Sequence, residues 1–126
     1  MKTRTRPVHL DLLRIHLPLP GWVSILHRLS GALLFLAVPL AVALLAQSLS
    51  DEAGFWALIE GARHPAARML ALLLFWAFVF HLFAGVRHLA LDMHRGVGLQ
   101  AARRSGLATV AASVAATFAF AVWLLA

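Results

Sequence analysis

Three ionisable side chains and a glycine recur at intervals of three or four residues within an otherwise apolar stretch. They are His81, Gly85, His88 and Asp92. This spacing places them on one face of an α-helix, with Arg87 just beside that face. Ionisable groups at membrane depth are costly, and they usually face a protein interior, a cavity or a cofactor. The stripe is therefore the first candidate for a functional site.

His81 is the residue of this stripe that is best suited to redox chemistry. An imidazole between apolar neighbours can ligate a metal, relay protons or hydrogen-bond a neighbouring helix. Gly85, one turn further along, leaves room for a flat macrocycle, although it would equally permit close helix packing. Haem is the prosthetic group that an axial histidine in a helical bundle serves. We therefore expect haem ligation at His81, with a packing or hydrogen-bonding histidine as the alternative.

Cationic and hydroxyl side chains extend the candidate site. Arg28, Arg87 and His88 are suited to haem propionates, because buried carboxylates need paired cations. For Arg87 the alternative is snorkelling to the lipid headgroups. Ser24 and Arg28 lie one helical turn apart and could hydrogen-bond a quinone carbonyl, whereas a helix-start role is the alternative for Ser24.

Composition identifies a membrane protein. Of 126 residues, 62% are hydrophobic and 13% are charged, and this length allows roughly three transmembrane helices in a single domain. The net charge of +6 comes from basic residues beside apolar segments, so we expect no nucleic-acid partner. Because there is no cysteine, any bound metal must use histidine.

Apolar runs and their flanking residues predict an all-α membrane fold. No removable signal peptide is expected, because the N-terminus is polar through Arg14 without a short apolar core. A short surface helix is expected in the first connection, with Trp56 as an interfacial anchor. The predicted parts are a basic N-terminal segment at 1–20, spans at 22–49, 69–91 and 106–126, and a first connection at 50–68.

Charge distribution predicts the orientation of the spans. Lysines and arginines precede the first span and lie between the second and third, whereas the first connection is near neutral. The N-terminus should therefore be cytoplasmic and the C-terminus periplasmic, in a bacterial inner membrane. His81 then lies near mid-bilayer, and His88 lies about 10 Å closer to the cytoplasm. Arg87, His88 and Asp92 share this shallow layer with Arg28.

The chain offers no second histidine at a suitable depth for the other axial position of a haem. His27 and His88 lie too near the cytoplasmic surface, and His64 lies in the outer connection. We therefore expect the chain to supply half of a haem site, with another membrane subunit supplying the second histidine.

Three stretches of the sequence resemble a known family, the larger cytochrome b membrane-anchor subunit of succinate dehydrogenase, respiratory complex II. The first is Arg6-Pro7-Val8-His9-Leu10-Asp11-Leu12. The second is Ser24-Ile25-Leu26-His27-Arg28-Leu29-Ser30-Gly31, which resembles the family motif S-I-L-H-R-x-S-G. The third is His81-x-x-x-Gly85-x-Arg87-His88-x-x-x-Asp92. Their order and the three-span layout also agree with that family.

The resemblance implies more specific roles. His81 would be one axial ligand of haem b, and a small anchor subunit would supply the other. Ser24 and Arg28 would line the ubiquinone site close to the iron-sulfur subunit, and His27 would lie near the propionates. His88 and Asp92 match family positions of less defined role, which we assign to contacts around the propionates.

The same resemblance implies the electron path. Succinate would be oxidised on a flavoprotein subunit, and electrons would pass through the iron-sulfur subunit to ubiquinone, so this chain would do no dehydrogenase chemistry itself. Two alternatives remain open at this stage. One is the anchor of a fumarate reductase, and the other is a small non-redox helical membrane protein.

Overall fold

The computed structural model describes residues 17–126, which fold into helices and their connections. The helices are α1 (Leu19–Ser48), α2 (Glu52–Ala62), α3 (Pro65–Asp92) and α4 (Leu99–Leu125). Three of them, α1, α3 and α4, are long and apolar enough to cross a membrane. Residues 17–126 contain no strand. The predicted all-α fold with three candidate spans is thereby confirmed.

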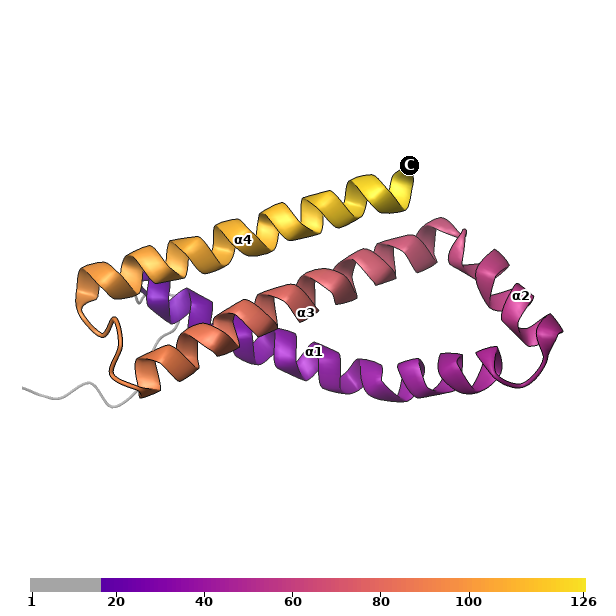
Figure 1. Ribbon diagram of the computed structural model, residues 1–126, viewed down its shortest axis with the longest axis horizontal. Coiled ribbons are helices and arrows are strands. Elements are labelled where there is room, and N and C mark those ends of the chain that lie inside the picture. The colour runs from indigo at the N-terminus through magenta and orange to yellow at the C-terminus, as the bar shows by residue number, and fades with distance from the viewer. Residues whose placement is uncertain (1–16) are drawn as a thin grey trace, which may run out of the picture.

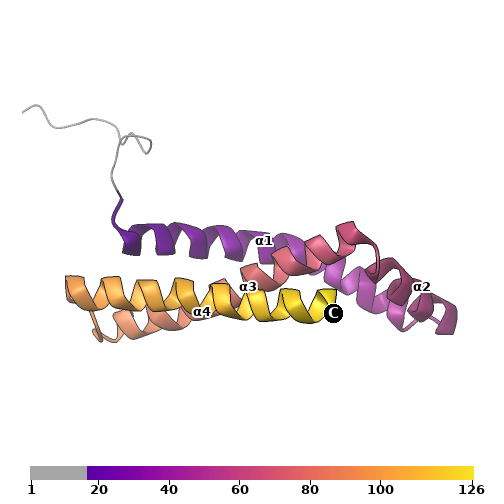
Figure 2. The same cartoon turned by 90° about the horizontal axis from the view of Figure 1, so that it is seen from above.

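The three long helices meet at one end of the molecule. Helices α3 and α4 run antiparallel beside each other, and α1 crosses α3 and then diverges from it toward α2 (Figure 1). Seen at a right angle to that view, α1 begins in a separate layer above α3 and α4 (Figure 2). The first turns of α1 and α4 therefore share one end with the last turns of α3, and α2 closes the opposite end.

The helices extend beyond the apolar segments that hydropathy identifies. Pro18 precedes α1 as its N-cap and Pro20 lies in its first turn, a position that suits the fixed φ angle of proline. His64 caps α3, because its Nδ1 accepts a hydrogen bond from the Ala66 N–H at 3.2 Å. Helix α4 begins at Leu99, so it already contains basic residues that sequence alone assigns to the connection.

A small core joins α1, α3 and α4. Val23, Phe80 and Ala84 are buried, and Leu26, Trp76 and Val110 pack against them. On α4, Thr109, Ser113 and Thr117 each donate their hydroxyl to the carbonyl four residues earlier, at 2.7 to 3.0 Å. These hydroxyls can lie in apolar surroundings because their own helix satisfies them.

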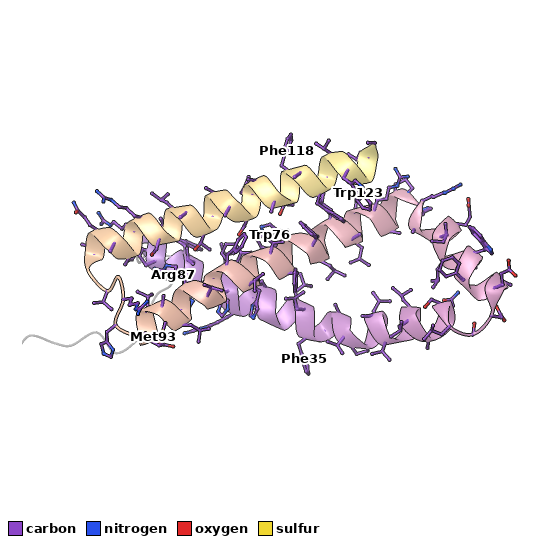
Figure 3. The ribbon with its side chains drawn as sticks, viewed as in Figure 1. Phe35, Trp76, Arg87, Met93, Phe118 and Trp123 are labelled. Atoms are coloured by element: carbon purple, nitrogen blue, oxygen red, sulfur yellow. The ribbon has the colours of Figure 1, made fainter. Side chains whose placement is uncertain are left out.

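Large apolar side chains cover the outer faces of the bundle. Phe35 and Phe118 point away from the other helices (Figure 3) and are 76% and 69% exposed. In water such surfaces would be unfavourable, whereas lipid tails or a partner helix can cover them.

Two parts of the sequence-based prediction are not tested by the described residues. The stretch Arg6–Leu12 and most of the basic segment 1–20 lie outside the described residues. The orientation of the spans across the membrane also stays a prediction, because the fold alone does not assign either end to the cytoplasm.

Candidate functional site

Three histidines from two helices form a stack where α1 crosses α3. The His27 ring of α1 lies between two rings of α3. Its centroid is 4.2 Å from that of His81, with 14° between the planes, and 4.8 Å from that of His88, with 19° between the planes. His81 and His88 are two helical turns apart, so one α1 side chain fills the space between them. Residues distant in sequence thus meet at one place.

Hydrogen bonds determine which nitrogen of His81 carries the proton. His81 Nδ1 lies 3.1 Å from the backbone carbonyl oxygen of His27, and a carbonyl can only accept. The Ser30 hydroxyl donates to the same carbonyl at 2.9 Å, and its oxygen lies 3.4 Å from His81 Nδ1. Nδ1 is therefore the protonated nitrogen. The lone pair of Nε2 lies in the plane of the ring, where stacking on the ring face does not cover it.

Glycine permits the close approach of His81 to α1. A Cβ at Gly31 would lie 2.7 Å from His81 Cε1 and 3.1 Å from Nδ1, well inside van der Waals contact. The imidazole therefore rests directly against the α1 backbone. Gly85 on α3 differs from Gly31, since a Cβ there would lie 3.5 Å from His27 Nε2, which is an ordinary van der Waals distance. The space beside Gly85 faces His27 and would accept a Cβ, so the contacts of this glycine do not require close packing and its role stays a prediction.

His88 is oriented by its own helix. Its Nδ1 donates to the Ala84 carbonyl at 2.7 Å, so Nε2 is the ring nitrogen that remains for other contacts. Ser24 is half-buried on α1, and Arg28 is exposed one turn later. Asp92 is the last residue of α3 and is exposed. These three residues thus lie near the stack at the same end of the bundle without joining it.

Arg87 faces a different helix. Its Nε donates to Ser105 Oγ at 3.0 Å, and its Nη2 donates to the Ala102 carbonyl at 3.1 Å. Both acceptors belong to α4, and Figure 3 shows Arg87 between α3 and α4. These contacts favour a role at the α3–α4 junction over the propionate role suggested by its place beside the stripe.

The histidine arrangement fits one axial haem ligand. Metal-ligating histidines commonly donate their other ring nitrogen to a carbonyl, which fixes the tautomer and orients the ring, and His81 shows this arrangement toward His27. Within residues 17–126, no group of three His, Asp or Glu side chains converges to hold a metal ion. His27 and His81 cannot ligate opposite sides of one iron, because parallel rings 4.2 Å apart leave no space for a macrocycle.

Two residues of this site cannot be predicted from the chemistry of their side chains. Ser30 is fully buried beside His81, and Gly31 provides the surface for the ring. Both belong to the S-I-L-H-R-x-S-G stretch, so their position in a recognisable motif was the available signal. A lone serine or glycine on an apolar helix otherwise gives no sign of such a role.

Comparisons with known proteins show which family the sequence is similar to. A family model described as "Succinate dehydrogenase/Fumarate reductase transmembrane subunit" matches residues 2–120. The succinate dehydrogenase cytochrome b556 subunit of Coxiella burnetii is 37% identical over 120 residues, covering 94% of this chain and 96% of that relative. The subunit of the same name from Paracoccus denitrificans is 29% identical over 109 residues, covering 86% and 84%.

Gly31→Ala should destabilise the α1–α3 crossing. The added methyl group would displace the His81 ring, at a cost of about 1–3 kcal/mol for overpacking. Thermal unfolding of the detergent-solubilised protein measures this loss. Gly61→Ala on α2 is the matched control, because nothing lies within 4 Å of its Cβ position. An unchanged midpoint in Gly31→Ala would contradict the close approach.

Proposed function

The chain belongs to the succinate dehydrogenase/fumarate reductase transmembrane subunit family, and we propose that it is the cytochrome b anchor of a succinate:ubiquinone oxidoreductase. The family description covers both directions of the reaction. The names of the two relatives support succinate oxidation. In this proposal the chain anchors the complex, carries one haem ligand and forms part of the quinone pocket.

The orientation of His81 is the observation that carries the haem assignment. Its Nδ1 is held by the His27 carbonyl, so its Nε2 is the nitrogen that would bind iron. When bound, haem b supplies one-electron redox chemistry. Around it, His27 and His88 would meet the propionates from α1 and α3, with the Arg28 guanidinium adding positive charge.

The second axial ligand would come from a small anchor subunit. In this chain, His27 and His88 are already stacked parallel to each other and to His81 on one side of α3. A partner histidine would approach from outside the bundle, where apolar side chains of α1 and α3 are exposed. The site is therefore shared between two membrane subunits.

Ser24 and Arg28 would form the quinone-binding part of the chain. A half-buried hydroxyl and an exposed guanidinium, one turn apart on α1, can both donate to a quinone carbonyl. The iron-sulfur subunit would dock at this end and deliver electrons from succinate oxidised on the flavoprotein subunit. With the N-terminus cytoplasmic, this end faces the cytoplasm of a bacterial cell and the spans lie in its inner membrane.

The isolated chain should not form a six-coordinate bis-histidine haem. Because it would supply a single axial ligand, haem added to the purified polypeptide should give a spectrum without the low-spin bis-histidine signature. Co-expression with the other anchor subunit should restore it. A stable bis-histidine spectrum from this chain alone would overturn the shared site.

Arg28→Leu should impair quinone reduction selectively. The variant removes a donor from the pocket, and loss of a charged hydrogen-bonding group costs about 1.5–3 kcal/mol, or roughly tenfold to a hundredfold in quinone-dependent activity. Succinate oxidation by artificial dyes should remain close to that of the unmodified complex. Equal loss of both activities would instead indicate a defect in assembly or docking.

A further inference from the structure

A pocket separate from the histidine stack lies between α3 and α4, beside the loop that joins them. Its volume is about 330 Å³, and it is lined mainly by apolar side chains, with Arg87, Arg95 and Ser105 among them. We propose that this pocket binds an anionic phospholipid, with the lipid phosphate on Arg87 and Arg95 and an acyl chain along the apolar wall.

The pocket and the histidine stack occupy opposite faces of α3. Ala90, which lines the pocket, follows His81 by nine residues, which is about 900° of helical rotation and therefore half a turn away. His81 and His88 face α1, whereas Arg87 faces α4. A ligand in this pocket would therefore not compete with a group bound to His81.

Buried positive charge is the first reason to expect an anion. Arg87 is 7% exposed and keeps its charge at any physiological pH. Its two hydrogen bonds go to a neutral hydroxyl and a neutral carbonyl. Within residues 17–126, no carboxylate lies within 4.0 Å of its guanidinium. A buried cation without a counter-charge is costly, and a phosphate would supply that charge.

The guanidinium can still reach a ligand. Among the described residues, no hydrogen bond uses Nη1 of Arg87, and no fully buried side-chain nitrogen or oxygen lacks a partner. Arg87 lines the pocket, so its guanidinium borders the space that a ligand would fill. Arg95 enters the same pocket from the loop and is exposed, so two cations converge on one space.

The arrangement of polar and apolar groups fits an amphiphile. On α4 the lining runs from Ser105 to Ala112, which is about 10 Å along the helix axis. Arg95 and Ser105 lie at the loop end, whereas Phe83, Ala108 and Ala112 lie deeper along the spans. Basic pockets between transmembrane helices near the membrane surface are suited to anionic headgroups. Free phosphate would leave the apolar wall uncovered, whereas a phospholipid would contact both the arginines and the apolar wall.

Lipid binding to the purified complex tests this proposal. The delipidated complex is titrated with phosphatidylglycerol or with phosphatidylcholine of the same acyl chains, and bound lipids are counted by native mass spectrometry. The unmodified complex should retain phosphatidylglycerol in preference to phosphatidylcholine. Arg87→Gln should weaken phosphatidylglycerol binding by about tenfold or more, because a charge-assisted hydrogen bond is lost.

Two further variants keep the test decisive. Ala112→Phe fills the apolar part of the pocket at an exposed position, so it should also weaken binding while Arg87 remains. If Arg87→Gln fails to assemble, Ala112→Phe decides alone. Arg103→Gln is the control, since this exposed residue is absent from the lining, and it should bind as the unmodified complex does.

Three results would overturn the assignment. The first is equal affinity of the unmodified complex for the two lipids. The second is phosphatidylglycerol binding that neither Arg87→Gln nor Ala112→Phe weakens. The third combines two observations: the unmodified complex binds no phosphatidylglycerol, and the Arg87→Gln complex loses the other anchor subunit. This result would identify the occupant of the pocket as a side chain of the partner subunit.

Discussion

The hydrogen bond from His81 Nδ1 to the His27 carbonyl is the contact on which the rest of the site depends. It joins α3 to the backbone of α1 where the two helices cross, and Ser30 supports it from the same turn. Because the acceptor is a backbone carbonyl, its position follows from the helix itself. Gly31 makes this contact possible by leaving no side chain between the ring and α1.

Hydropathy and spacing were sufficient for the architecture, but predicted depth wrongly separated His27 from His81, whose ring centroids lie 4.2 Å apart where α1 crosses α3. Three apolar runs predicted the spans, and the spacing from His81 to Asp92 correctly assigned them to one helix. Depth in the membrane grouped Arg28 with His88 because antiparallel helices return to the same surface. These conclusions need only the length and direction of each helix.

The rotation of one helix against another could not be predicted from hydropathy and spacing. Apolar residues surround most of helix α3, and its stripe of ionisable residues does not indicate whether that face meets α1 or α4. Arg87 was therefore placed with the histidines, although its hydrogen bonds go to α4. The closeness of His27 to Gly85 and of His81 to Gly31 depends on the same rotation. In our proposals, this rotation gives α3 one face for a haem ligand and another for lipid.

The spin state of the haem in the purified complex tests most directly whether His81 is an axial ligand. We expect a low-spin b-type spectrum from the unmodified complex. His81→Leu should lose this six-coordinate signature, because one iron ligand is removed. His88→Leu, in the same stack, should keep it. An unchanged low-spin spectrum in His81→Leu would contradict the account.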